Sequence, residues 1–131
     1  LAASSACWKL VYFHHPPLSS GPHGSSAWVQ WPFPAWGADV VLSGHDHTYE
    51  RIIVNGFPYF VNGLGGNSRY SFGSPVVGSQ VRYNATFGAM RVTATWTTIL
   101  YEFIATNGTV LDSYLQSKDC SRVSRASHVE P

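Results

Sequence analysis

Charged side chains are scarce in this sequence of 131 residues, at 11% of the chain against about 25% in a typical soluble protein. The formal net charge is only +1, and no clustered basic run stands behind it. Nucleic acid and acidic membrane surfaces are therefore poor candidates as partners. No stretch approaches the roughly 18 apolar residues of a membrane-spanning helix, so we expect no membrane association of that kind.

The N-terminus, LAASSACWKL, lacks both an initiator methionine and a signal-peptide pattern. We therefore interpret Leu1 as a cut point inside a longer protein. The chain has only two cysteines, Cys7 and Cys120, which lie near its opposite ends. They can pair only if those ends are neighbours, so the sequence leaves both a disulfide and two free thiols open.

Aromatic residues, in contrast, are abundant at 15%, and lysine is rare beside many serines and threonines. Two Asn-x-Thr triplets begin at Asn84 and Asn107. Such triplets are glycosylation acceptors in secreted proteins, although they also occur by chance. We expect a secreted or extracellular setting, with both asparagines exposed as candidate glycosylation sites.

Apolar runs bounded by turn residues predict a series of strands. The first part of the chain has the order strand, loop, helix, strand, in which Pro32 and Pro34 limit the helix to one or two turns. The rest favours antiparallel strands, and residues 64–86 are predicted to form a long loop. Strands are predicted over 8–15 and 39–44, over two segments joined at Asn55-Gly56, and over three segments with turns near 95–96 and at 107–108.

The length fits roughly one domain. We place it at residues 1–118 and expect a disordered polar tail at 119–131, with His128 in it and without a role.

Two pairs of histidines follow predicted strands. His14 and His15 end the first strand, and His45 and His47 follow the second. Ligands bind at the carboxyl ends of strands in α/β sheets, so both pairs are expected at one site. Alternate residues of an extended segment face the same way, which would aim His45 and His47 together and turn Asp46 elsewhere. Neutral imidazole is a common ligand for zinc and iron.

His23 lies in the Pro/Gly/Ser-rich loop after His14. Two interpretations of His23 stay open: a proton donor or phosphate contact above the site, or an exposed loop residue without a role.

Three segments together carry a family resemblance: VYFHHPP, GADVVLSGHDHTYER and PYFVNGLGG. They resemble the C-terminal half of the calcineurin-like metallophosphoesterases, purple acid phosphatase branch. That family carries a Val-x-x-His motif and then Gly-His-x-His, usually followed by Tyr-Glu-Arg. Residues 11–14 match the first motif, and residues 44–51 match the second.

The resemblance implies a role for each histidine. His14 and His45 would bind one metal ion, His47 would bind another, and His23 would contact phosphate or protonate the leaving group. His15 matches no ligand position, but a shifted register with His15 as the ligand stays open. The implied cofactors are two metal ions, drawn from Fe, Zn and Mn.

The family's remaining ligands come from three earlier motifs, and none of them occurs in this chain. The resemblance therefore implies the histidine half of an acid phosphatase-like, metal-dependent phosphoesterase that hydrolyses small phosphate esters or nucleotides. The missing N-terminal half would be its partner, and the isolated chain is expected to be inactive. The implied fold class is α/β: half of a β-sandwich flanked by helices, with mostly mixed or antiparallel strands in this segment.

Two other readings compete. A cupin would need a more distant glutamate than Glu50 and a later histidine. A non-catalytic, secreted, β-rich binding module with a single metal would use Trp28, Trp31 and Trp36 for contacts, whereas we expect these tryptophans to pack against the sheet. We also expect Glu50 and Arg51 to pair behind the site, and the segments at 62–63 and 65–66 to shape a loop beside it.

Overall fold

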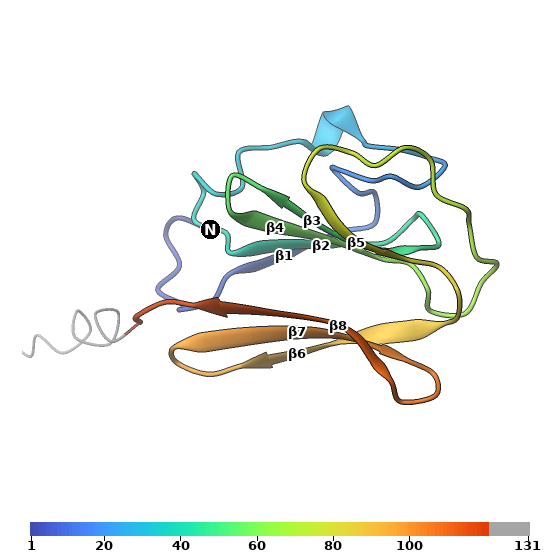
Figure 1. Cartoon of the computed structure of the whole chain (residues 1–131). Helices are drawn as coiled ribbons and strands as arrows, with labels where there is room; N and C mark the ends of the chain where they lie inside the picture. Colours follow the sequence, from blue (N-terminus) through green and yellow to red (C-terminus); the bar gives the residue numbers. More distant parts are fainter. Residues whose placement is uncertain (121–131) are drawn as a thin grey trace, which may run out of the picture.

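Two β-sheets stack face to face in the computed structural model, which describes residues 1–120 (Figure 1). One sheet has five strands in the order β1-β2-β4-β3-β5, and the other has three in the order β6-β7-β8. The strand bounds are β1 Leu10–Tyr12, β2 Val40–Ser43, β3 Tyr49–Val54, β4 Phe57–Asn62, β5 Ser79–Tyr83, β6 Gly88–Ala94, β7 Thr98–Ala105 and β8 Val110–Ser117.

The five-stranded sheet is mixed. Strands β1, β2 and β4 are mutually parallel, whereas β3 is antiparallel to both β4 and β5. The carboxyl ends of the three parallel strands therefore meet at one edge of the sheet. The order strand, loop, helical turn, strand that we predicted for the first part of the chain is confirmed, whereas the antiparallel prediction for the rest was wrong for β4, which pairs parallel to β2. This arrangement positions the site described below.

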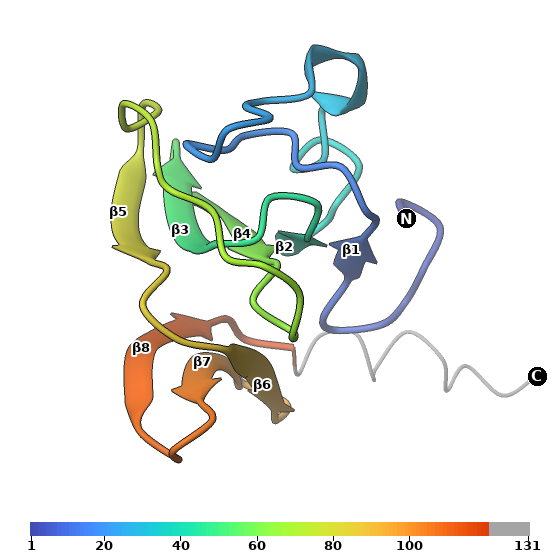
Figure 2. The ribbon, with the colours of Figure 1, turned by 90° about the vertical axis from the view of Figure 1, so that its right-hand side faces the viewer.

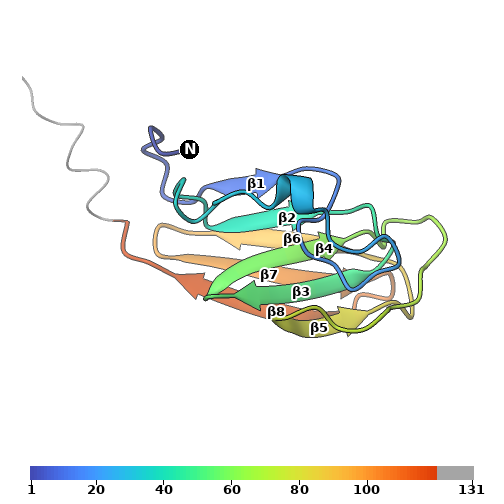
Figure 3. The same ribbon diagram turned by 90° about the horizontal axis from the view of Figure 1, so that it is seen from above.

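The flanking helices that we predicted are missing from residues 1–120, where the only helix is the 3-10 turn η1, Ala27–Val29. It lies on the outer face of the five-stranded sheet, above β1 and β2 (Figure 3). This single turn agrees with the one or two helical turns that we predicted for this segment. Pro32 and Pro34 explain its shortness, because proline lacks the N–H that would continue a helix.

Aromatic side chains from both sheets fill the space between them. The rings of Tyr49 and Phe103 stack with centroids 4.2 Å apart, and Phe60 packs on Tyr101 at 5.0 Å. Alternate residues of β7 are buried, as expected for a strand with one face on a core. The end-on view shows β8, β7 and β6 lying beneath the β5 side of the larger sheet, so that β1 projects past β6 (Figure 2).

A second apolar cluster covers the outer face of the five-stranded sheet. Phe33, from the segment after η1, is buried there against Ala38, Val41 and Phe57. Val40 faces the inter-sheet core while Val41 faces this cluster, and neither is exposed. Strand β2 is thus covered on both sides, which agrees with its continuous apolar sequence.

The turns agree with the sequence. Asn55 and Gly56 join β3 to β4 with positive φ angles of 50° and 78°, the conformation that favours Asn-Gly in hairpins. The turns between β6, β7 and β8 also fall where they were predicted. The loop predicted over residues 64–86 was wrong in part, because it contains β5. That strand has a polar sequence and presents only Val81 and Tyr83 to the core.

The two ends of the described chain are joined by a disulfide between Cys7 and Cys120. This settles the alternative that the sequence left open. Residues 121–131, including His128 and most of the predicted disordered tail, lie outside the described residues. Across residues 1–120 no helix has the length and apolar character needed to cross a membrane.

Candidate metal centre

Histidines from two neighbouring strand ends meet at the carboxyl edge of the five-stranded sheet. His14 follows β1, and His45 follows β2, two residues after its end. The Nε2 atom of His14 lies 3.0 Å from the Nδ1 atom of His45. The parallel pairing of β1 with β2 brings them together, so residues 31 positions apart in sequence offer adjacent ring nitrogens.

The turn that carries His45 is not extended, and our prediction of an extended segment was wrong. His45 has a φ of 66°, in the left-handed region that non-glycine residues seldom adopt. The amide of Asp46 donates to the carbonyl of Gly44, and that of Thr48 donates to the carbonyl of Asp46, both at 2.8 Å. The rule that alternate residues of an extended strand face the same way therefore does not apply to His45 and His47. A tight turn sets the positions of their side chains instead.

His47 is fixed by two contacts, neither of them with another histidine. Its Nδ1 atom is 2.6 Å from the carbonyl oxygen of Ser68, and its ring stacks on Tyr70 with centroids 4.2 Å apart. A carbonyl can only accept, so Nδ1 carries the proton and Nε2 keeps its lone pair. This is the arrangement commonly found in histidines that bind metal ions.

His15 and His23 complete a cluster around His45. Their ring centroids lie 4.3 Å and 4.4 Å from that of His45, and His15 also contacts Trp28 at 5.4 Å. Burial and the charges of the three neighbouring histidines lower the pKa of His45 below its ordinary value. The negative charge of Asp46 raises this pKa, but by less than the other effects lower it. The free protein thus favours the neutral imidazole, the form that binds metals.

Two further expectations concern residues just after the histidines. Our prediction that Glu50 and Arg51 pair with each other was wrong. They are neighbours on one strand, so their side chains face opposite sides of the sheet. Glu50 is fully buried and accepts from Ser20 and Ser79, whereas Arg51 binds Asp112 of the other sheet.

The loop expected at residues 62–66 does lie beside the site. The amide of Gly63 donates to the carbonyl of Thr48 at 2.9 Å. A Cβ atom at Gly63 would lie 1.9 Å from the carbonyl oxygen of Asp46, so only glycine permits this approach. The nearby Oδ1 atom of Asn62 is buried and has no hydrogen-bond partner among the described residues.

The tryptophans pack less fully than we expected. Trp28, Trp31 and Trp36 are 66%, 47% and 41% exposed, and Phe33 is the residue that packs into the sheet. Sequence alone could not separate them, because all four belong to one aromatic segment.

Sequence reasoning missed Ser68 and Tyr70, which hold His47 from within a Gly/Ser/Asn-rich loop. No sequence signal pointed to them, since their role comes entirely from where the loop returns.

The donor set fits only part of a dinuclear centre. Within residues 1–120, no three His, Cys, Asp or Glu side chains are arranged to hold a metal ion. The pair His14 and His45 and the free nitrogen of His47 fit as ligands. Two divalent cations about 4 Å apart would also need carboxylate charge to offset their repulsion, and this edge supplies none that is free. Asp46, the nearest carboxylate in sequence, is buried and hydrogen-bonded to the loop that carries His23.

Comparison with known proteins supports the fold and the family resemblance. Residues 56–113 match the family model described as iron/zinc purple acid phosphatase-like protein C. The chain is similar in structure to the purple acid phosphatase PPD1 from yellow lupin (Lupinus luteus) seeds, with a TM-score of 0.76 and 22% identity over 88% of this chain and 26% of that one. Together they confirm the resemblance inferred from the histidine motifs.

The chain is also similar to GAP50, described as the anchor in the inner membrane complex of Plasmodium. The TM-score is 0.74, with 20% identity over 92% of this chain and 42% of that one. No curated protein sequence matches the chain. At such identities the structural likeness establishes the fold, and the chain spans less than half the length of either relative.

Proposed function

We propose that this chain supplies the histidine half of a dinuclear phosphoesterase site. The match of residues 56–113 to the iron/zinc purple acid phosphatase-like family model supports this proposal. The observation that carries the proposal is the pairing of His14 Nε2 with His45 Nδ1 at 3.0 Å. The neighbouring His47 adds a ring whose tautomer is set by Ser68. His14 and His45 would hold one ion and His47 the other.

Bound metal ions of the Fe, Zn or Mn type would supply a hydroxide nucleophile near neutral pH and positive charge for the phosphate. The chain's own contribution is ligation and orientation. The hydrogen bond to Ser68 and the stack on Tyr70 restrict rotation of His47. His23 would donate a proton to the leaving group or bind a phosphate oxygen, and its ring lies 4.4 Å from that of His45. Small phosphate esters and nucleotides are the proposed substrates.

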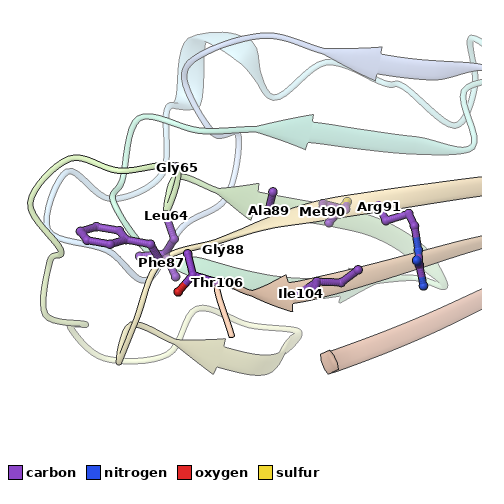
Figure 4. A pocket seen from close by; sticks show the side chains of 9 residues that line it. All are labelled: Leu64, Gly65, Phe87, Gly88, Ala89, Met90, Arg91, Ile104 and Thr106. Atoms are coloured by element: carbon purple, nitrogen blue, oxygen red, sulfur yellow. The ribbon is translucent and has the colours of Figure 1, made fainter. Parts of the chain in front are cut away.

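The proposed partner is an N-terminal half of the same protein, which would bring the carboxylate ligands. One side of the sandwich is open to receive it. Tyr12 on the edge strand β1 is 83% exposed. An apolar pocket beside edge strand β6, lined by residues such as Leu64, Phe87, Met90 and Ile104, opens on the surface (Figure 4). A second hollow connects β1, His14 and Asn62 with Met90 and Val92 of β6.

The test is to produce the chain alone and joined to the segment encoded before Leu1, and to assay p-nitrophenyl phosphate hydrolysis and metal content. We expect activity and two metal ions only in the longer protein. Activity of the 131-residue chain would contradict the need for a partner. A longer protein with no hydrolysis and no second metal would contradict the phosphoesterase.

A non-catalytic module with a single metal is the second candidate. Two observations favour it: the likeness to a protein described as an anchor, and the incomplete ligand set in residues 1–120. One tightly bound zinc ion in the isolated chain, together with an inactive longer protein, would decide for this alternative.

We further propose that the protein is secreted and glycosylated. The disulfide Cys7–Cys120 suits an oxidising compartment. Asn107 is exposed at the β7–β8 turn, whereas the side-chain amide of Asn84 is half-buried and donates to the carbonyl of Tyr70 at 2.7 Å. Mass spectrometry of protein secreted from a eukaryotic host would show glycan at Asn107, and an unmodified Asn107 there would count against the proposal.

A further inference from the structure

We propose that Glu50 is a positioning residue that anchors the loop carrying His23 and so fixes the distance between His23 and the paired histidines. The inference rests on the proposed function for what His23 does, but the anchoring itself is a property of this chain. Glu50 lies in β3, which follows the histidine turn, and within residues 1–120 the hydrogen bonds of its side chain go to Ser20 and Ser79 and not to a histidine.

Glu50 accepts three hydrogen bonds, and two come from one residue of the loop. The amide of Ser20 donates to Oε2 at 2.7 Å, and the hydroxyl of Ser20 donates to Oε1 at 2.5 Å. The third comes from the hydroxyl of Ser79 in β5, at 2.6 Å from Oε1. The carboxylate thus ties the loop after β1 to the β3–β5 side of the sheet.

The buried carboxylate of Glu50 depends on its hydrogen-bond donors, because no charged partner stabilises it in the described part of the chain. Glu50 is 0% exposed, and no ion pair to it is found within residues 1–120. A buried carboxylate is costly unless donors satisfy it, and here those donors are a backbone amide and two hydroxyls. Because two of the three come from Ser20, moving the loop away would leave the carboxylate poorly satisfied. The loop is therefore held at one place.

Asp46 gives the same loop a second anchor, nearer to His23. Its carboxylate accepts from the hydroxyl of Ser19 and, at 3.0 Å, from the amide of His23. Gly21 passes so close that a Cβ atom there would lie 2.3 Å from the carboxyl carbon of Asp46. The loop is thus pressed against the sheet between two buried carboxylates, although its sequence, SSGPH, offers no apolar side chain other than proline.

The consequence for the site is a fixed His23. His23 is exposed to solvent, and its ring contacts only the rings of His45 and Tyr70 among the ring contacts of the described residues. Its backbone amide is bound to Asp46, so the loop sets where the ring begins and the two ring contacts only orient it. Losing the anchor at Ser20 should let His23 move without disturbing His14, His45 or His47, whose hydrogen bonds do not involve Glu50. A proton donor displaced by about 1 Å is expected to lose much of its effect.

A matched pair of variants tests the anchor. Ser20→Ala and Ser79→Ala each remove one hydroxyl bonded to the same Oε1 atom, but only the first removes a bond from the loop. The Ser20 hydroxyl also accepts from the amide of Val76 at 2.9 Å, so thermal unfolding of both variants must be measured beside the test. A third comparison is between Glu50→Gln and Glu50→Ala. It tests whether a side chain of the same shape that can still form hydrogen bonds keeps the loop in place.

The first readout is amide hydrogen exchange at residues 19–24 of this chain. We expect about tenfold faster exchange in Ser20→Ala than in Ser79→Ala, because Ser20 lies in the loop whose amides are measured, whereas Ser79 lies in β5. Glu50→Gln should stay near the wild type, and Glu50→Ala should exceed both. Equal exchange in the two serine variants would overturn the proposal.

The second readout is kcat in the longer protein that contains the upstream half. Ser20→Ala should lower kcat about tenfold or more with unchanged metal content, since general acid–base groups contribute about 100-fold or more. Ser79→Ala should change kcat less than about twofold, within the spread expected of a residue outside the site. Equal losses of kcat would overturn the positioning role. If the wild type has no activity, the proposed function fails, and the exchange measurement alone decides whether Glu50 anchors the loop.

Discussion

The guanidinium of Arg51, in the five-stranded sheet, binds the carboxylate of Asp112, in the three-stranded sheet, through two hydrogen bonds. Nε lies 2.7 Å from Oδ2, and Nη2 lies 3.0 Å from Oδ1. The hydroxyl of Tyr49 donates to the same Oδ2 atom at 2.7 Å. The side chains of Arg51 and Asp112 are 16% and 7% exposed, so this pair joins the two layers at a largely buried position.

The first prediction concerns the strength of that connection. Arg51→Met should lower the free energy of unfolding by about 3 kcal/mol, because it leaves a buried carboxylate with only the Tyr49 hydroxyl as a side-chain donor. Arg91→Met is the matched control, since Arg91 pairs with Glu102 but is 59% exposed, and it should cost less than about 1 kcal/mol. Urea denaturation of the two variants measures both. Equal costs would contradict a structural role for the Arg51 pair.

The second prediction is a pH dependence of stability. Burial raises the pKa of Asp112, but hydrogen bonds from Arg51 and Tyr49 outweigh it and set the pKa below its ordinary value. The pair thus stabilises the fold above the unfolded-state pKa of about 3.9, and this contribution disappears as pH falls through the lower folded-state pKa. Asp112→Asn should therefore be less stable than the wild type at pH 7, by an amount that shrinks below about pH 4. A gap that stays constant with pH would refute it.

The third prediction concerns the disulfide. Cys7 and Cys120 are 113 residues apart in sequence, so their bond closes a loop almost as long as the chain. Replacing both with alanine should lower the free energy of unfolding by about 4 kcal/mol, because the unfolded chain regains the freedom the bond removes. Thermal unfolding of this double variant should match that of the reduced wild type. A melting temperature unaffected by reductant would show that the bond does not form.

The fourth prediction separates the two registers of the first histidine motif. His14 approaches a nitrogen of His45 at 3.0 Å, whereas His15 faces the same ring at a centroid distance of 4.3 Å and contacts Trp28. In the longer protein, His14→Ala should weaken metal binding by more than the roughly 100-fold expected for a supporting residue. His15→Ala should weaken it by less than about tenfold. Metal titration followed by mass spectrometry measures both, and the reverse order would assign the ligand to His15.

The fifth prediction addresses Tyr70. Its ring stacks on His47 at an interplanar angle of 15°. Removing it in Tyr70→Ala should weaken binding of the ion held by His47 about fivefold, the amount expected from one aromatic contact. Tyr70→Phe keeps the ring and should bind like the wild type. If Tyr70→Phe weakens metal binding as much as Tyr70→Ala does, the hydroxyl of Tyr70 and not its ring stacking supports His47.

Local signals predicted most of the strands correctly. The Asn55-Gly56 turn, the proline-limited helical turn and the buried run of β2 all carry their structure in short segments, because turn chemistry and side-chain periodicity act over a few residues. Strand β5 was missed for the opposite reason. Its sequence is polar, and it becomes a strand only because β3 offers an unpaired edge beside it.

The amino-acid sequence by itself determined the resemblance to purple acid phosphatases, the strand ends that carry His14 and His45, and the hairpin between β3 and β4, because each depends on residue types at short, fixed spacings. Only the tertiary structure decided the left-handed turn at His45, the stacking of Tyr70 on His47, the separate partners of Glu50 and Arg51, and the pairing of Cys7 with Cys120. These depend on where distant segments return to the sheet, and that is set by packing and burial over the whole described chain.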